Sequence, residues 1–315
     1  MTSTVPGKPL KVFVSYRHLD GDWVWDRLVP CLRAGGAEVL IDAERFRPGG
    51  GVYRQMDAAQ DQADRHVLVL SDAYLASGAC RHEMERAVAF DPKFEHHIVQ
   101  PVRRDDCAIP DVLKPADPTL YTDLRDDRDA AAWKKLLDEC GAELGTTAPH
   151  WLDARDEVVR WLRDNTSVNL LVLGDGLKWR ELIEDVRSRP GNELGLFDMH
   201  RGVAAARSEL IRAMLAECHL PLSVRPEPHD LADFESALAA RVRTRLGLLH
   251  FDMVEDPQRS NVYGTSLFTA LRYQVMEKKN LVLLLQSRRA FGALCPPGHL
   301  LSTLDVKTVE LKATP

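Results

Sequence analysis

The sequence has no long apolar run and no surplus of positive charge. No stretch approaches the ~18 consecutive apolar residues of a membrane span, and the first ten residues lack the apolar segment of a signal peptide. The 41 Lys and Arg residues stand against 47 Asp and Glu residues, which gives a net charge of −6. An overall basic field that would attract nucleic acid is therefore absent. We expect a soluble, cytoplasmic protein, with neither a membrane nor nucleic acid as a partner.

Cysteine is sparse and widely spaced. The six cysteines form no close pair, and no Cys/His cluster has the spacing of a zinc site. We therefore expect buried free thiols, no metal site and no bound cofactor.

The chain is long enough for two domains, each with its own core. At roughly 100 to 200 residues per domain, 315 residues predict two, and a hydrophobic content of 45% is sufficient for both. The residues fall into a domain at 8–145, a linker with a connecting helix at 146–165, and a second domain at 166–315.

Short β-branched runs alternate with helical stretches in both halves, which is typical of a doubly wound α/β fold with a parallel sheet. The first half predicts strands at 11–15, 38–41, 66–70 and 97–102 and helices at 22–34, 51–63, 80–90 and 130–144. The second half predicts helices at 151–163, 179–187, 203–219, 231–245 and 265–277, and strands at 169–173, 194–198, 248–253, 281–286 and 306–311.

Polar residues follow each of the first three predicted strands. Ligands of open α/β sheets bind beyond the carboxyl ends of the strands, so these tips are candidate binding positions. The tips are residues 15–18, 42–45 and 71–72, with the sequences SYRH, DAER and SD. We expect them to surround one ligand.

The helix after the third strand carries a carboxylate on its apolar face. Cys80, Met84, Ala87 and Val88 form a stripe at helical spacing, and Glu83 lies on that stripe. Such a carboxylate either stabilises the end of the helix by its charge or takes part in binding or catalysis. Its convergence with the three strand tips favours a part in binding or catalysis.

Residues 8–144 resemble a TIR domain. The resemblance rests on VFVSYR at 12–17, on Ile41 and Asp42 followed by RPGG at 47–50, and on SDAYLASGACRHE at 71–83. One residue departs from the family pattern, because Ala79 stands where a Trp usually precedes the Glu by four positions. The implied fold is a flavodoxin-like doubly wound parallel sheet.

The resemblance implies one of two roles: cleavage of NAD+ at the nicotinamide-ribose bond, or assembly of a signalling scaffold without chemistry. In the enzyme role, Glu83 is the catalytic residue. The residues that would line the NAD+ pocket are Tyr16, Arg17, Asp42, Arg45 and Ser71. NAD+ would be the substrate, and the product would be ADP-ribose or a cyclised form.

The resemblance also implies self-association through the TIR domains. In the family, the loop that contains glycines 49–51 packs against a neighbouring TIR domain and completes the pocket. A layout of this kind resembles bacterial TIR effectors that deplete NAD+ in antiviral defence.

The second half loosely resembles the nucleotide-binding core of STAND proteins, in particular a degenerate class with no catalytic loop. GDGLKW at 174–179 follows a strand where a phosphate-binding loop would lie, but its spacing does not fit one. The resemblance implies a sensing or oligomerising module that receives an activating ligand or protein.

Two acidic residues in the second half admit different interpretations. Asp198 and Asp252 each follow a hydrophobic strand, and we favour a capping role for both. A less favoured alternative places a metal-dependent reaction at Asp198, His200 and Asp252.

Overall fold

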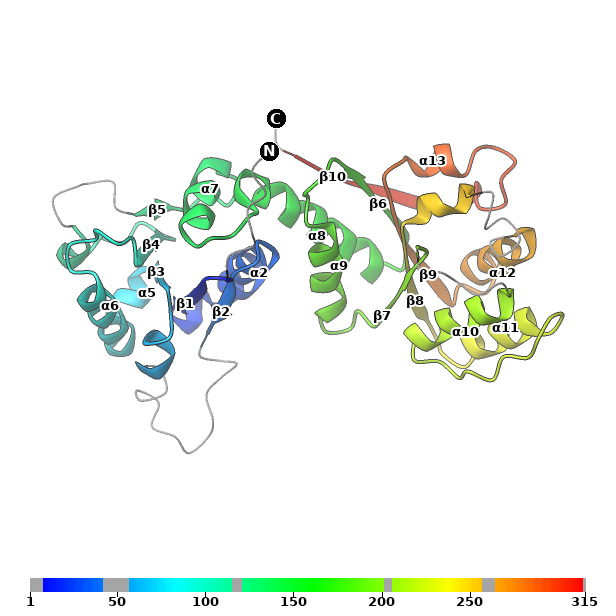
Figure 1. The fold of residues 1–315 in the computed structure, drawn as a ribbon, viewed down its shortest axis with the longest axis horizontal. Helices are drawn as coiled ribbons and strands as arrows, with labels where there is room; N and C mark the ends of the chain where they lie inside the picture. Colours follow the sequence, from blue (N-terminus) through cyan, green and yellow to red (C-terminus); the bar gives the residue numbers. More distant parts are fainter. Residues whose placement is uncertain (1–7, 42–56, 115–120, 201–205, 257–263, 314–315) are drawn as a thin grey trace. The chain divides into compact units, whose positions relative to one another are not determined.

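The computed structural model describes residues 8–41, 57–114, 121–200, 206–256 and 264–313. The chain divides into two units between Leu152 and Asp153, a point that lies inside helix α8 (Ala148–Arg163). Each unit contains one parallel sheet with helices (Figure 1), which confirms the predicted α/β class.

The first unit is built on five parallel strands in the order β2-β1-β3-β4-β5. This is the 2-1-3-4-5 order of the flavodoxin-like fold. The strands are β1 (Lys11–Ser15), β2 (Glu38–Leu40), β3 (Arg65–Leu70), β4 (Val99–Arg103) and β5 (Thr122–Asp123). The central strands β1 and β3 are almost entirely buried, as expected for a parallel sheet covered on both faces.

Helices cover both faces of this sheet, with α2 on one side and α5 and α6 on the other (Figure 1). The longer helices of the first unit are α2 (Val29–Ala34), α5 (Asp72–Ala76), α6 (Gly78–Phe90) and α7 (Ala130–Glu139). The shorter turns are η1 (His18–Asp20), α1 (Gly21–Trp23), the π-helical η2 (Val24–Leu28), η3 (Asp111–Leu113) and η4 (Gly145–Thr147).

The second unit contains another five-stranded parallel sheet, in the order β10-β6-β9-β8-β7. Its strands are β6 (Ser167–Leu173), β7 (Leu194–Asp198), β8 (Thr244–Leu249), β9 (Leu281–Ser287) and β10 (Val306–Lys312). Apart from α8, its helices are α9 (Trp179–Ser188), α10 (Arg207–Glu217), α11 (Asp230–Ala239), η5 (Phe251–Glu255), α12 (Thr265–Met276) and α13 (Phe291–Leu294). Helices α8 and α9 lie on one side of the sheet, and α10, α11 and α12 lie on the other (Figure 1).

Two elements of the second half were predicted with wrong boundaries. The helix predicted at 231–245 ends at Ala239, and the strand predicted at 248–253 begins at Thr244 and ends at Leu249. Thr244 and Arg245 pair with Leu281 and Val282 of β9. Strand pairing therefore overrides a local pattern that is equally compatible with a helix. Parts of the helices predicted at 51–63 and 203–219 lie outside the described residues.

All six cysteines are buried free thiols, as predicted. Among the described helices, none is both long and apolar enough to cross a membrane.

A buried imidazole lies in the core of the first unit. His66 of β3 is 1% exposed, and its ring stacks on Phe90 with centroids 5.4 Å apart. Among the described residues, its Nδ1 atom has no hydrogen-bond partner. Burial, together with the nearby positive charge of Arg86, lowers the pKa of His66 from 6.5 to about 4 despite the opposing effect of Asp61.

Acidification should therefore destabilise the first unit through His66. The unfolded chain binds a proton near pH 6.5 and the folded chain only near pH 4, so stability present above pH 6.5 is lost as the pH falls towards 4. This pKa difference corresponds to about 3 kcal/mol. Urea unfolding measured at several pH values in this window should show that His66→Leu lacks this component. An identical loss of stability in parent and variant would contradict the assignment.

Candidate functional site in the first unit

The candidate site lies at the carboxyl ends of β1 and β3. In a sheet of order 2-1-3-4-5, the connections run in opposite directions from this pair of strands, and ligands of such folds bind at that point. The register pairs Ser15, the last residue of β1, with Leu68 of β3. Helices α5 and α6 follow β3 directly, so their first residues also lie near this edge.

Helix α6 turns Glu83 towards the sheet. The buried residues of the helix are Cys80, Glu83, Met84, Ala87 and Val88, which is the predicted apolar face. Glu83 is 5% exposed, whereas Glu85, two residues further along, is exposed. The sequence prediction that Glu83 faces inward is confirmed.

A chain of hydroxyl groups ends at the Glu83 carboxylate. Ser15 Oγ donates a hydrogen bond to Glu83 Oε2 at 2.5 Å, and Ser15 Oγ lies 2.8 Å from the hydroxyl of Tyr74. A serine hydroxyl has one hydrogen, which is used by Glu83, so the tyrosine must donate to the serine. The order Tyr74, Ser15, Glu83 aligns both dipoles towards the carboxylate.

The phenol at the start of this chain keeps its proton. Burial raises the pKa of Tyr74 well above 10, and the charge of Glu83 adds to that rise, while the hydrogen bond with Ser15 opposes it. Tyr74 is therefore a permanent donor in the physiological pH range.

Two further contacts fix the position of α6 over the end of β1. Cys80 Sγ lies 3.7 Å from the backbone oxygen of Tyr16, and the buried amide of Gln60 donates to the backbone oxygen of Glu83 at 3.0 Å. Ser77 caps the start of the helix through the backbone N–H of Cys80.

The other predicted pocket residues that the structure describes differ in burial. The buried Tyr16 directs its hydroxyl towards Trp25, whose indole N–H donates to it at 3.1 Å, and Arg17 is exposed at the start of η1. Asp42 and Arg45, together with the glycine loop at 49–51, lie outside the described residues.

The hydrogen bonds of the Ser71 side chain go to Asp20 and Tyr74, and not to Glu83. Its hydroxyl accepts from the backbone N–H of Tyr74, which caps α5, and donates to Asp20 Oδ2 at 2.7 Å. Burial raises the pKa of Asp20, with a further increase from Asp105, while Ser71 and Arg104 oppose the rise. Ser71 therefore orients a second carboxylate at the same edge of the sheet.

The site contains two residues that the sequence interpretation did not assign to it, Tyr74 and Asp20, and one, Ser15, that it placed at a strand tip without giving it a role. Ser15 ends a predicted strand, so its position at the tip was available as a signal. Tyr74 belongs to a short helix, α5, that was not predicted, and Asp20 belongs to the turn η1. Their contacts depend on segments between 51 and 68 positions apart in the chain.

The strand tips of the second unit also carry polar groups. Asp198 Oδ1 accepts from the backbone N–H of His200 at 2.9 Å, within the turn after β7, while Asp252 Oδ2 accepts from the backbone N–H of Arg288, after β9. Neither carboxylate caps a described helix, because α10 and η5 begin after Ala206 and His250 without a side-chain cap, so the favoured capping role is not found there. The structure brings Asp198 and His200 together with His250, a residue that the sequence interpretation did not include.

The turn between β6 and α9 contains three residues in a left-handed backbone conformation. Gly174, Gly176 and Lys178 all have positive φ values, of 138°, 74° and 50°. Asp175 in this turn forms an exposed ion pair with Arg288 at 2.8 Å.

Comparisons with known proteins identify the first unit. The TIR domain family matches residues 12–137. Among solved structures, the TIR domain of the Toll-related receptor TRR-2 from Hydra magnipapillata is 21% identical, with a TM-score of 0.36, and the match covers 41% of this chain and 96% of that one. No curated protein matches the chain.

Two other solved structures match larger parts of the chain. One is Drosophila ORC bound to AT-rich DNA and Cdc6, at 12% identity and a TM-score of 0.33, with 66% of this chain and 36% of that chain covered. The other is NtrX from Brucella abortus in complex with ADP, at 11% identity and a TM-score of 0.30, with 97% and 69% covered.

The TIR family includes proteins that signal and proteins that cleave NAD+, and TIR domains commonly self-associate. On this family match, residues 12–137 of the chain are a TIR domain.

Proposed function

We propose that the TIR domain cleaves NAD+ at the bond between nicotinamide and ribose. The observation that carries this proposal is the inward-facing Glu83 carboxylate at the carboxyl end of β1, held by Ser15. A carboxylate in that position can stabilise the positive charge that develops on the ribose as the bond breaks.

The reaction requires stabilisation of positive charge. As the C1′–N bond breaks, its electron pair leaves with nicotinamide, which departs as a neutral molecule and needs no general acid. The ribose acquires oxocarbenium character, which a nearby carboxylate stabilises. Such stabilisation is stronger away from bulk water, where Glu83 lies. Attack of water on C1′ then gives ADP-ribose and a proton, while attack by the adenine of the same molecule gives a cyclised product.

The hydroxyl chain contributes by orientation. Ser15 fixes Oε2 of Glu83 and Tyr74 fixes Ser15, so the carboxylate is prepared before the substrate binds. In the same proposal, Tyr16 packs on a ring of NAD+, Asp42 and Ser71 line the pocket, and Arg17 and Arg45 pair with the diphosphate.

We further propose that the second unit controls this activity. Unrestrained cleavage would destroy the NAD+ of the cell that makes the protein, which requires a trigger. A regulatory module of the degenerate STAND type fits an α/β unit whose strand-helix turn, residues 174–178, lacks phosphate-loop spacing. Antiviral defence, with an activating ligand or protein bound at this unit, is the setting that we infer.

Replacing the carboxylate by an amide of the same shape should abolish NAD+ cleavage. Glu83→Gln keeps an acceptor for Ser15 but removes the charge, so nicotinamide release should fall by about a hundredfold or more. The matched control is Glu85→Gln, which makes the same change on the exposed side of α6 and should leave the rate unaltered. Chromatography of the products separates nicotinamide, ADP-ribose and cyclised forms.

Equal rates in the two variants would remove Glu83 from its catalytic role. Absence of any release from concentrated parent protein, with and without lysate from infected cells, would favour a TIR scaffold that mediates protein contacts.

Removal of the Ser15 hydroxyl should lower the free energy of unfolding more than removal of the Tyr74 hydroxyl. Ser15→Ala takes a donor from a buried carboxylate, which costs about 1–3 kcal/mol, whereas Tyr74→Phe leaves the bond between Ser15 and Glu83 in place and costs about 1 kcal/mol. Hydrogen exchange over residues 11–15 and 78–90 measures both. A larger loss in Tyr74→Phe would contradict the proposed order of donors.

Activity per molecule should fall on dilution, because we propose that a neighbouring TIR domain completes the pocket. An inactive Glu83→Gln chain still presents the neighbour surface, so its addition to dilute parent protein should restore the parent's rate. A dilute parent that is as active per molecule as a concentrated one, and that is unaffected by the variant, would exclude this requirement.

A further inference from the structure

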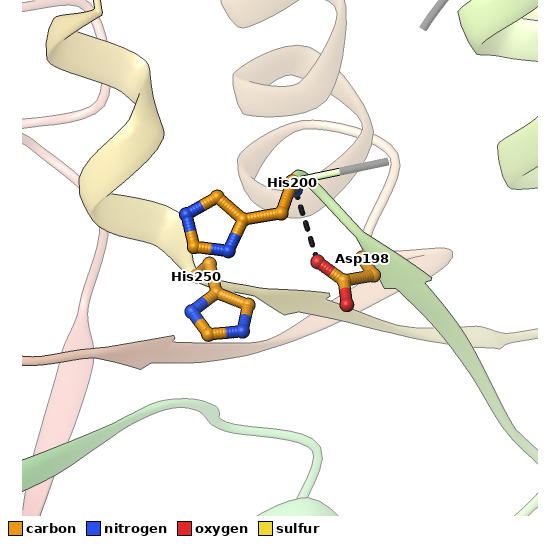
Figure 2. A group of neighbouring side chains, drawn as sticks. All are labelled: Asp198, His200 and His250. Carbon is orange, nitrogen blue, oxygen red and sulfur yellow. Dashed lines mark hydrogen bonds between the residues drawn. The ribbon is translucent and has the colours of Figure 1, made fainter. Parts of the chain in front are cut away.

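The carboxyl ends of β7 and β8 bring together one carboxylate and two imidazoles, from Asp198, His200 and His250. Figure 2 shows the two rings lying one over the other, with the carboxylate of Asp198 beside them. One potential ligand atom from each residue lies within 4.8 Å of the other two. All three residues belong to the second unit.

Strand register explains why these distant residues meet. Asp198 is the last residue of β7 and pairs with Leu249 of β8, so His250 comes one position after that pair. The bond from the backbone N–H of His200 to Asp198 Oδ1, 2.9 Å long, turns the chain back after β7. As a result, the His200 ring stacks on His250 with centroids 4.0 Å apart.

A guanidinium group interacts with two members of the cluster. Arg180 Nη2 lies 2.8 Å from His250 Nε2 and 3.5 Å from Asp198 Oδ2. Arginine can only donate, so Nε2 of His250 must present its lone pair, which is the form that ligates a metal. A positively charged group therefore already lies between the carboxylate and the imidazole.

This guanidinium is held by contacts that a metal ion could displace. The Arg180 side chain is 53% exposed, and its other described contact is with the ring of Trp179, 4.5 Å from the centroid. Exposed ion pairs of this kind contribute little stability.

His250, unlike Arg180, is held in place by contacts of both its backbone and its ring. It has φ 56° and ψ 48°, a left-handed conformation that is costly for a residue with a Cβ atom. The buried side chain of Gln286 accepts from its backbone N–H at 2.9 Å, and the Trp179 ring meets its imidazole edge-on at 5.2 Å. These contacts hold the imidazole at the strand tip.

We propose that Asp198, His200 and His250 bind one divalent transition-metal ion, with Zn²⁺ as the representative. Two imidazole nitrogens and one carboxylate oxygen form a donor set that these ions favour over Ca²⁺ or Mg²⁺. With metal-ligand distances of about 2.1 Å, tetrahedral ligand atoms lie about 3.4 Å apart, so the ligand atoms close by up to about 1.4 Å from their present spacing. The two stacked rings turn so that their in-plane lone pairs point at the ion, and Arg180 swings away. Three protein ligands leave one position for water or for a group from a partner.

Zinc binding to the metal-stripped full-length chain tests this site. Isothermal titration should give one Zn²⁺ per chain, and Co²⁺ should give visible bands of a low-symmetry site. Asp198→Asn, His200→Ala and His250→Ala should each weaken zinc binding by about a hundredfold or more, since even outer-shell changes cost 10- to 100-fold. The matched control, His229→Ala, removes an exposed histidine of the same unit and should leave binding unchanged.

A second variant distinguishes the site from general loss of structure. Arg180→Ala removes the competing cation and should tighten zinc binding by about fivefold, the equivalent of one net hydrogen bond. Weaker binding in Arg180→Ala, or equal binding in the ligand variants and His229→Ala, would overturn the proposal. Neither result depends on NAD+ cleavage.

Discussion

The arrangement of the TIR site depends on one buried hydrogen bond, between Ser15 of β1 and Glu83 of α6. An anion in a protein interior is costly unless donors compensate it, and Ser15 supplies one at 2.5 Å. Through this bond the helix is tied to the end of the strand, and through Tyr74 the same serine is tied to α5. Stability and the proposed chemistry thus rest on the same contact.

The two units use the edge of a parallel sheet in different ways. In the first, a helix after β3 supplies the central carboxylate, and hydroxyl groups orient it. In the second, the strand tips themselves supply the polar groups, and the stacked imidazoles of His200 and His250 are partly open to solvent. The buried site suits charge stabilisation, whereas the more open cluster suits an ion that binds and leaves.

The local spacing of hydrophobic residues was sufficient to predict elements that bury one face against the sheet or that form a buried strand. The stripe of α6 follows from helical spacing, which is why Glu83 could be placed inward, and strands β1 and β7 match their predicted ranges. Pattern failed at residues 244–245, which were predicted as the end of a helix and instead pair with β9 as the start of a strand. Helix α5 was missed because five residues are too few for a period to appear.

The sequence by itself determined the alternation of strands and helices, the family of the first unit and the inward direction of Glu83, because these depend on local spacing and on short motifs. Only the tertiary structure decided which groups meet. Ser15 reaches Glu83 across 68 positions, and His250 reaches Asp198 because β7 pairs with β8 in one register. The spacing of residues along the chain does not predict which strands and helices contact each other, because these contacts are fixed by the joint burial of elements that are distant in sequence.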